Sequence, residues 1–339
     1  MSKGEKEMET MRSVLCMAPG KVEILEVPVP EPEPNEVLIE TRAVGLCTSD
    51  VYILTGKSPD QYPASNIGHE PSGIVRAVGK NVTRFKVGDR VTTLWAKGGF
   101  MQYSDYYVQD ESYVFLLPDS IPFAYGLCEP LGAASRGICG AGILPGDTVA
   151  VVGAGYFGQL IAQLARNLGS WRVVVLDKVP YRLKIAQELG ADAVYNIAED
   201  GIRRAITEIT SGKGFDLVAE CAGVEGAFDT CVELVRVGGT VYAYGWHVHT
   251  ETISPYVWHT KHFKLLSNAW VAHNPFDTER FKRMAEIAIK WLERGLWRVD
   301  PLIKDITSIE NLMMAVELVT KHPDQIIKAV IGPKSSAVE

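Results

Sequence analysis

The sequence predicts an α/β protein in which a β-rich domain is joined to a doubly wound parallel sheet. Three observations lead to this fold class. The chain has 339 residues, which exceeds one ordinary hydrophobic core and suits two domains. From residue 11 to about 118, short strand-like runs are separated by turn residues. From about residue 131 to 270, strand-length apolar runs alternate with helix-length amphipathic runs.

The β-rich domain begins after a polar tail at residues 1–10, which we expect to be flexible. Its strand-length runs are apolar or alternate between apolar and polar residues. The proline-rich run PVPEPEPNE at residues 28–36 can only be extended or turn-like. The expected strands are residues 11–17, 21–27, 36–46, 71–82, 88–95 and 103–109.

The second domain has the alternation of strands and helices that is typical of a parallel sheet. Its strands are apolar over most of their length, and its helices have apolar residues at helical spacing. The expected strands are residues 147–155, 171–177, 193–197, 215–223, 239–246 and 263–270, and the expected helices are 156–169, 179–191, one between 197 and 215, and 225–238.

After residue 270 the sequence predicts two helices, at 277–295 and 308–322, and a last strand at 326–332. Because few strands remain in this region, it shows no new core of its own. We therefore expect it to complete the β-rich domain. The expected domains are residues 11–130 with 271–339, and the inserted domain 131–270.

Composition excludes several classes of protein. Hydrophobic residues make up 47% and charged residues 22% of the chain, as in ordinary globular proteins. The net charge is −7 without a basic run, which argues against a nucleic-acid partner. Six cysteines without a C-x-x-C pair argue against a disulfide scaffold. The polar N-terminus and the lack of a membrane-length apolar stretch favour the cytoplasm and no membrane partner.

The pattern GAGYFG at residues 153–158 lies between an expected strand and an expected helix. Glycines there permit a tight turn and close approach of a pyrophosphate to the helix N-terminus. Asp177 ends the next strand and suits the ribose hydroxyls of NAD better than the phosphate of NADP, although Lys178 and Arg182 are nearby. The alternative is a glycine turn that binds no nucleotide. The expected cofactor contacts are Gly153, Gly155, Tyr156, Phe157, Gly158, Asp177, Lys178 and Arg182.

Three short segments carry side chains of the types that bind metals. They are GLCTSD with Cys47 and Asp50, IGHEPSG with His69 and Glu70, and LCEPLG with Cys128 and Glu129. A thiolate, an imidazole and a carboxylate from separate segments form a three-ligand set for catalytic zinc, which leaves one position open.

From about residue 11, nearly the whole chain resembles the zinc-dependent medium-chain alcohol and polyol dehydrogenases. GHEPSG at 68–73 followed by VGDRV at 87–91 is highly specific to them, and CEPLG at 128–132 is most similar to the sorbitol-dehydrogenase branch. The resemblance implies a chaperonin-10-like (GroES-like) β-domain, a Rossmann domain and an active site between them.

The resemblance also implies roles for individual residues. Cys47 and His69 would bind zinc directly. Glu70 and Glu129 would share the remaining protein position, one of them directly and the other through water or in an alternate state. This would place Glu70 among the catalytic residues.

Four more roles follow from the resemblance. Asp50 would hydrogen-bond the far nitrogen of His69 and fix its tautomer. Ser49 would contact the substrate oxygen and take its proton, and Lys328 would reach the cofactor pyrophosphate. Tyr52 stands where a histidine often completes the proton relay, and a phenol with a pKa of about 10 is a poorer proton acceptor than imidazole.

The chain lacks the family's four-cysteine lobe, because VTTLWAK runs directly into GGFMQYSDYY at residues 91–107. We therefore expect one catalytic zinc and no structural zinc.

Substrate-pocket candidates are Trp95, Trp246 and His247. The last two lie in a His- and Trp-rich segment at residues 245–262, where imidazoles and aromatic faces would suit a hydroxylated ring. The alternatives for this segment are packing in a subunit interface or core, and a second metal site. That metal site would use His247, His249, His259 and His262, but no thiolate or carboxylate set accompanies them.

These observations together predict a zinc-dependent dehydrogenase that transfers hydride between NAD and a secondary alcohol, such as a polyol, a cyclitol or a sugar derivative. Two alternatives are a zinc-free quinone or enone reductase on the same scaffold and a non-catalytic nucleotide-binding protein. The resemblance further implies a homodimer or homotetramer.

Overall fold

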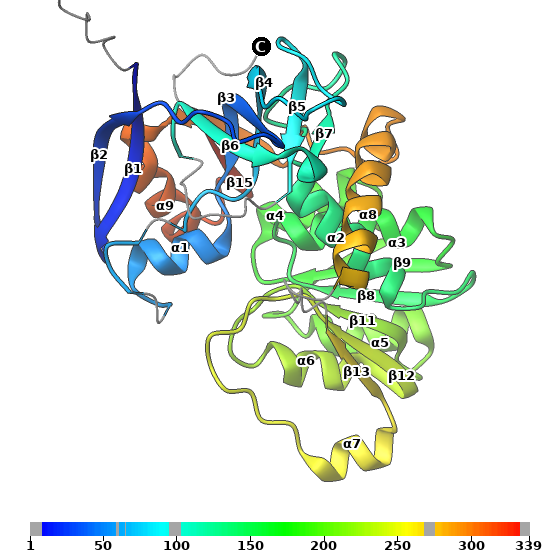
Figure 1. Ribbon diagram of the computed structural model, residues 1–339. Coiled ribbons are helices and arrows are strands. Elements are labelled where there is room, and N and C mark those ends of the chain that lie inside the picture. The colour runs from blue at the N-terminus through cyan, green and yellow to red at the C-terminus, as the bar shows by residue number, and fades with distance from the viewer. Residues whose placement is uncertain (1–8, 59–60, 65, 95–102, 268–274, 333–339) are drawn as a thin grey trace, which may run out of the picture. The chain divides into compact units, whose positions relative to one another are not determined.

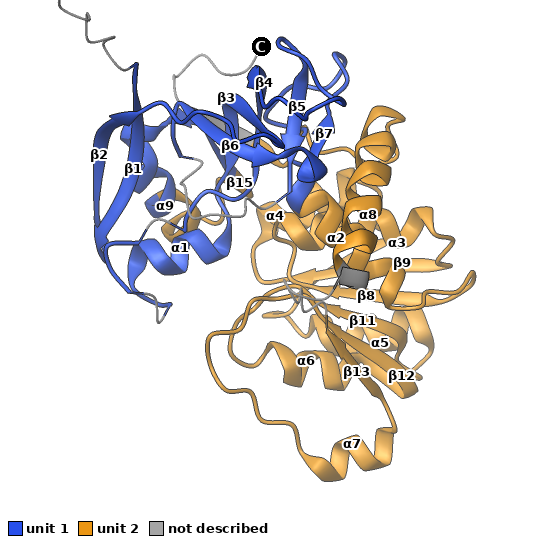
Figure 2. Ribbon diagram, viewed as in Figure 1, with its two compact units in different colours: residues 1–129, 305–317, 329–339 blue, residues 130–304, 318–328 orange. Residues whose placement is uncertain are grey.

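The computed structural model describes residues 9–58, 61–64, 66–94, 103–267 and 275–332. The chain divides into two compact units, drawn in different colours in Figure 2. Unit 1 comprises residues 1–129, 305–317 and 329–339, and unit 2 comprises residues 130–304 and 318–328. None of the helices within the described ranges combines the length and hydropathy needed to cross a bilayer.

Unit 2 is built on a sheet that has six parallel strands in the described part of the chain, in the order β10-β9-β8-β11-β12-β13. Figure 1 labels five of them, β8, β9, β11, β12 and β13. Counted along the sequence this order is 3-2-1-4-5-6, the doubly wound order of dinucleotide-binding domains. The strands are β8 (Thr148–Val152), β9 (Arg172–Asp177), β10 (Ala193–Asn196), β11 (Phe215–Glu220), β12 (Val235–Ala243) and β13 (Lys264–Ser267).

Helices connect these strands and bury the sheet. Val149, Val151 and Val174 have no exposed surface, as expected for strands that helices cover on both faces. The helices are α2 (Cys128–Gly140, which begins in unit 1), α3 (Tyr156–Asn167), α4 (Pro180–Glu188), α5 (Gly201–Thr210), α6 (Ala227–Leu234), α7 (Pro255–Lys261) and α8 (Pro275–Glu293).

One predicted boundary in this unit is wrong. The helix expected over 225–238 ends at Leu234, and β12 starts at once with Val235. Val235 pairs with Phe215 of β11, and both side chains are buried in the sheet core. Sheet pairing and burial at this β-branched residue therefore outweigh the helical spacing of the segment.

Unit 1 is all-antiparallel wherever its strand pairing is described. β1 pairs with β2, and a second sheet has the order β14-β15-β3-β4-β5-β7 with β6 beside β3. Its core includes Val37, Ile39, Val75 and Tyr107. The strands are β1 (Thr10–Ala18), β2 (Lys21–Pro28), β3 (Glu36–Gly45), β4 (Pro71–Val78), β5 (Arg90–Thr93), β6 (Tyr106–Asp110), β7 (Val114–Leu116), β14 (Ile303–Ser308) and β15 (Lys328–Gly332).

Short helices join these strands. They are α1 (Thr48–Thr55), the 3-10 turns η1 (Glu111–Tyr113) and η2 (Ile309–Asn311), and α9 (Leu312–Lys321). The chain end returns to the β-rich unit as expected, since Val330 of β15 pairs with Gly45 of β3.

The units divide differently from the expected domains near the C-terminus. Residues 275–304 and 318–328, expected with the β-rich domain, belong to unit 2. Packing explains this difference. Arg136 of α2 lies over the ring of Phe281 in α8, 5.3 Å from its centroid, and the buried indole of Trp297 donates to the carbonyl of Leu160 in α3 (3.1 Å).

Candidate functional site

Three metal-binding side chains of unit 1 converge. One ligand atom each from Cys47, His69 and Glu70 lies within 4.8 Å of the others. Backbone pairing causes this, because Gly45 at the end of β3 donates to the carbonyl of Glu70, just before β4 (3.0 Å). The Cys47 and Glu70 segments are thereby held side by side.

Gly68 shapes the turn that presents His69. Its φ is +80°, and an added Cβ would lie 2.9 Å from the backbone nitrogen of Tyr103. Only glycine fits such a conformation and such a close approach. The sequence GHE thus places an imidazole and a carboxylate next to the Cys47 thiol because its first residue can take this turn.

Asp50 is fully buried and holds together the segments that carry Cys47 and His69. Its carboxylate accepts hydrogen bonds from the backbone nitrogens of Cys47 and Gly68 and from the Tyr103 hydroxyl, each at 3.0 Å. Its Oδ1 lies 3.4 Å from Nδ1 of His69. Burial alone would raise the pKa of Asp50, but His69 and these hydrogen bonds outweigh it and lower the pKa below its usual value. Asp50 is therefore a carboxylate that leaves Nε2 of His69 available for a metal.

The chemistry of this donor set fits zinc. Zinc takes Cys, His and carboxylate ligands, and its catalytic sites combine three protein donors with an open position. Glu70 is 2% exposed and belongs to the cluster. Glu129, at the start of α2, lies outside the group of ligand atoms that come within 4.8 Å of one another.

Helix α1 begins directly after Cys47 and carries Ser49 and Tyr52. Residues three apart lie on the same side of a helix, so both hydroxyls are on one face. Both side chains are partly buried. Burial raises the pKa of Tyr52, so its phenol keeps its proton at neutral pH.

The glycine loop of unit 2 has the form of a phosphate cradle. Gly153 has φ +99°, and an added Cβ would lie 2.7 Å from the backbone nitrogen of Ala222. A Cβ on Gly158 would lie 1.9 Å from the carbonyl oxygen of Gly153. At Gly155, which precedes α3, a Cβ would meet nothing within 4 Å. Gly153 thus permits the tight turn, Gly158 permits close packing, and Gly155 leaves space for a pyrophosphate.

Asp177 ends β9 and is 7% exposed. It accepts hydrogen bonds from the backbone nitrogens of Ala154 (2.6 Å) and Val179 (2.8 Å), so it ties the glycine loop to the end of the next strand. Lys178 is exposed beside it. Burial lowers the pKa of Arg182, and Asp177 opposes that shift.

Lys328 reaches the same loop from far along the chain. It is 5% exposed, and its ammonium group lies 4.9 Å from the ring centroid of Tyr156, the first residue of α3. The ring of Phe157 packs near that of Tyr244 (5.9 Å). A buried cation beside a helix N-terminus suits an anionic ligand.

The comparisons with known proteins agree with this geometry. Residues 33–140 match the family model "Alcohol dehydrogenase GroES-like domain", and residues 157–290 match "Zinc-binding dehydrogenase". A sorbitol dehydrogenase from Gallus gallus is 32% identical over 264 residues, which is 69% of this chain and 74% of the relative. The chain belongs to the zinc-dependent medium-chain alcohol and polyol dehydrogenases.

Other members of this family match the chain over nearly its full length. A sorbitol dehydrogenase from Bacillus subtilis (strain 168) is 27% identical over 360 residues and covers 96% of this chain and 98% of the relative. The crystal structure of an Escherichia coli oxidoreductase/dehydrogenase of unknown specificity has a TM-score of 0.86 and 26% identity, and covers 96% of this chain and 99% of that one.

Family membership confirms the predicted fold class, a GroES-like β-domain with a Rossmann-type sheet domain. As a medium-chain dehydrogenase, the protein is a zinc-dependent oxidoreductase of the alcohol and polyol class that uses a nicotinamide cofactor.

The substrate-pocket candidates have different environments. Trp95 lies outside the described residues. Trp246 is 63% exposed, whereas His247 is bound to the buried carboxylate of Glu220 (2.8 Å). The four histidines of the possible second metal site form two ring contacts. The rings of His259 and His262 have centroids 5.6 Å apart, and those of His247 and His249 have centroids 5.3 Å apart.

Sequence reasoning missed three site residues. Tyr103 completes the hydrogen bonding of Asp50 from 53 positions away, and no local pattern gives such a contact. Glu220 and Glu251 bind His247 and His249 respectively. The spacing H-x-H-x-E at residues 247–251 is a signal that could have revealed Glu251, since alternate residues of an extended chain share one side.

Proposed function

We propose that the protein oxidises a secondary alcohol of the polyol, cyclitol or sugar class, with NAD as hydride acceptor and one catalytic zinc. The observation that carries this proposal is the Cys47–His69–Glu70 cluster, whose ligand atoms lie within 4.8 Å of one another. The buried carboxylate of Asp50 lies 3.4 Å from Nδ1 of His69. A scaffold without zinc chemistry has no physical reason to keep these donors together.

We assign Cys47, His69 and Glu70 as the direct metal ligands and Glu129 as the residue that substitutes for Glu70 in an alternate state. When bound there, zinc acts as a Lewis acid that makes a substrate hydroxyl more acidic. Asp50 holds His69 by Nδ1, which fixes the tautomer with a free Nε2. The sequence has no cysteine between Cys47 and Cys128, which supports one catalytic zinc without the four-cysteine structural site.

Ser49 and Tyr52 transfer the proton of the substrate hydroxyl in this proposal. The Ser49 hydroxyl would accept the proton that the substrate hydroxyl loses and give up its own hydroxyl proton in the same step, toward the ribose hydroxyls of the bound nicotinamide cofactor. Tyr52, one turn along the same face of α1, keeps its own proton because burial raises its pKa. It therefore passes the proton outward by exchanging hydrogen bonds and not by ionising.

The cofactor-binding residues are the glycine loop at 153–158, Asp177 and Lys328. The loop and the N-terminus of α3 receive the pyrophosphate, and the Lys328 ammonium near Tyr156 adds a positive charge. The carboxylate of Asp177 favours the free ribose hydroxyls of NAD over a 2′-phosphate. Related structures have been solved with NADP, in a protein of Sinorhizobium meliloti, and with NADH, in a protein of E. coli CFT073.

We base the proposed substrate class on the relatives of this chain. They include sorbitol dehydrogenases and D-xylulose reductases, and the His- and Trp-rich segment at 245–262 supplies polar and aromatic groups for a hydroxylated ring. We also propose a homodimer or homotetramer, which light scattering on the purified full chain would measure.

The test is a screen of NADH formation over polyols, cyclitols and sugar alcohols, with NADP as the alternative cofactor, before and after metal removal by a chelator. We expect activity with NAD that disappears with the metal and returns with added Zn²⁺. Activity that survives complete removal of the metal would instead favour a zinc-free reductase.

Cys47→Ser should abolish NADH formation while NADH binding, followed by its fluorescence, is retained, because the cofactor loop belongs to unit 2. Cys139→Ser, a thiol in α2 that is not among the ligands, is the matched control and should stay active.

A further inference from the structure

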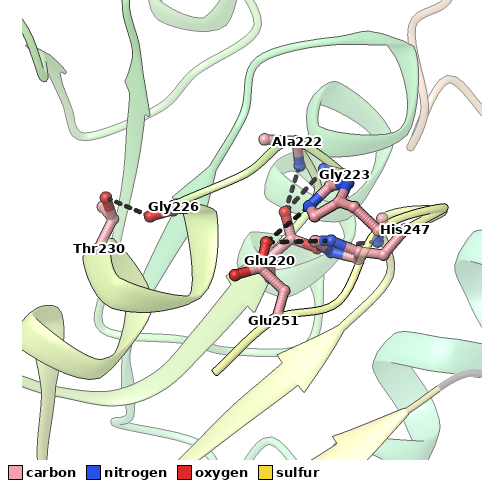
Figure 3. A network of polar contacts seen from close by, with 9 residues as sticks. Glu220, Ala222, Gly223, Gly226, Thr230, His247 and Glu251 are labelled. Carbon is pink, nitrogen blue, oxygen red and sulfur yellow. Dashed lines mark hydrogen bonds and ion pairs between the residues drawn. The ribbon is translucent and has the colours of Figure 1, made fainter. Parts of the chain in front are cut away.

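A second cluster of metal-binding side chains lies in unit 2. His247, His249 and Glu251 offer ligand atoms that all lie within 4.8 Å of one another. They belong to the segment between β12 and α7. Figure 3 shows the Glu220 carboxylate, at the end of β11, beside the ring of His247. The zinc, proton-transfer and cofactor roles proposed above belong to other residues.

Glu220 determines which nitrogen of His247 is available. The carboxylate is fully buried and is held by backbone nitrogens of Ala222 and Gly223, each at 2.8 Å. It lies 2.8 Å from Nε2 of His247, so that nitrogen carries the hydrogen and donates it. Neutral imidazole then has its lone pair on Nδ1. A carboxylate that holds the far nitrogen of a histidine is the usual support of a metal ligand.

The free nitrogen faces a second carboxylate. Nδ1 of His247 is buried without a hydrogen-bond partner among the described residues and lies 3.6 Å from Oε1 of Glu251. A lone pair that faces a carboxylate is repelled unless a cation lies between them. Neither Glu220 nor Glu251 is paired with a lysine or arginine in the described part of the chain.

His249 completes the set from the more open side. Its Nε2 lies 2.8 Å from Oε1 of Glu251, and its side chain is 30% exposed, against 14% for His247. Donors about 2.1 Å from a tetrahedral zinc are about 3.4 Å apart. The separations of 2.8 and 3.6 Å from Glu251 bracket that spacing, and all three ligand atoms lie within 4.8 Å of one another.

We infer that His247, His249 and Glu251 form a second metal site, which binds a zinc-class divalent ion and fixes the segment between β12 and α7. Two imidazoles and one carboxylate select zinc-like ions over Mg²⁺ and Ca²⁺, which prefer oxygen ligands. The competing state is a proton on Nδ1 of His247, which would make an imidazolium between two glutamates.

The test is the zinc content of the full-length protein after saturation with Zn²⁺ and removal of loosely bound ion. We expect about two equivalents in the wild type and about one in each of His249→Ala and Cys47→Ser, because each variant loses one donor set. His259→Ala, an exposed imidazole of α7 outside the cluster, is the matched control and should keep about two. Glu251→Gln, which preserves side-chain size, should also lower the content to about one.

A second measurement guards against variants that fold poorly. In the Cys47→Ser background, added Zn²⁺ should raise the melting temperature, and in Cys47→Ser/His249→Ala this rise should vanish. A wild type that binds one zinc, lost in Cys47→Ser and unchanged in His249→Ala, overturns the second site and leaves the dehydrogenase proposal intact. One zinc that depends on His249 and not on Cys47 supports the second site and contradicts the proposed catalytic zinc.

Discussion

At the scale of single residues, the catalytic cluster depends on an acceptor that must be a carboxylate. Asp50 receives donors from both sides: the backbone nitrogens of Cys47 and Gly68, the hydroxyl of Tyr103, and the ring nitrogen of His69. An amide at this position would turn an NH₂ group toward at least one of these donors. The cluster geometry therefore depends on a carboxylate at position 50.

Asp50→Asn should weaken zinc binding by about 10–100-fold, because a support of the ligand His69 is lost. Competition with a chromophoric chelator measures this affinity. Tyr103→Phe is the matched control, since it removes one donor and leaves the carboxylate with its other partners, so its loss of affinity should be clearly smaller. Wild-type zinc affinity in Asp50→Asn would contradict the positioning role.

At the scale of elements, the turn from β8 into α3 contains two glycines with different roles, one in the stability of the fold and one in cofactor binding. Gly158 cannot take a side chain, since an added Cβ would lie 1.9 Å from the carbonyl of Gly153. Gly155 can take one without a clash and has an ordinary extended φ of −69°. The two glycines of one motif thus serve the fold and the ligand respectively.

Gly155→Ala should leave the free energy of unfolding within about 0.5 kcal/mol of wild type. It should raise the Kd for NADH by at least about tenfold, because the methyl group fills the space of the pyrophosphate. Gly158→Ala should lower the melting temperature and binding together. Fluorescence titration with NADH and thermal unfolding measure both variants. Equal loss of stability in the two variants would argue against this division.

Part of the fold and part of the site could be predicted from the sequence. The parallel sheet was predictable because its strands are apolar and punctuated by glycines, and the resemblance indicated Cys47, His69 and Glu70, which the structure brings together. The start of β12 at Val235 was missed because strand pairing overrides a helical pattern. Tyr103 and Glu220 were missed because their roles depend on contacts that span many residues.

At the scale of the whole molecule, each unit has its own hydrophobic core, so stability can be changed in one unit alone. Asp216, near the start of β11, links three strands of unit 2. Its carboxylate accepts hydrogen bonds from the backbone nitrogen (2.8 Å) and hydroxyl (2.7 Å) of Thr148 in β8 and from Nε of Arg236 in β12 (2.6 Å). Burial alone would raise the pKa of Asp216, but these bonds lower it below its usual value.

Asp216→Asn should destabilise unit 2 by about 2 kcal/mol at neutral pH. Both Thr148 bonds end on Oδ2, so the amide oxygen of asparagine keeps them, without the charge that strengthens them. The amide NH₂ then faces Nε of Arg236, which adds a smaller loss because Arg236 is 41% exposed and its ion pair is screened by solvent. Since the folded pKa lies below the unfolded value of about 3.9, the contribution is present above that pH and is lost as the pH falls through the folded pKa.

The difference in melting temperature between wild type and Asp216→Asn should therefore be constant from about pH 6 to 8 and should shrink below about pH 4. Hydrogen exchange should locate the change in β8, β11 and β12, while the amides of β3 and β4 in unit 1 exchange as in the wild type. A difference that grows as the pH falls would mean that the Asp216 carboxylate does not carry this stability.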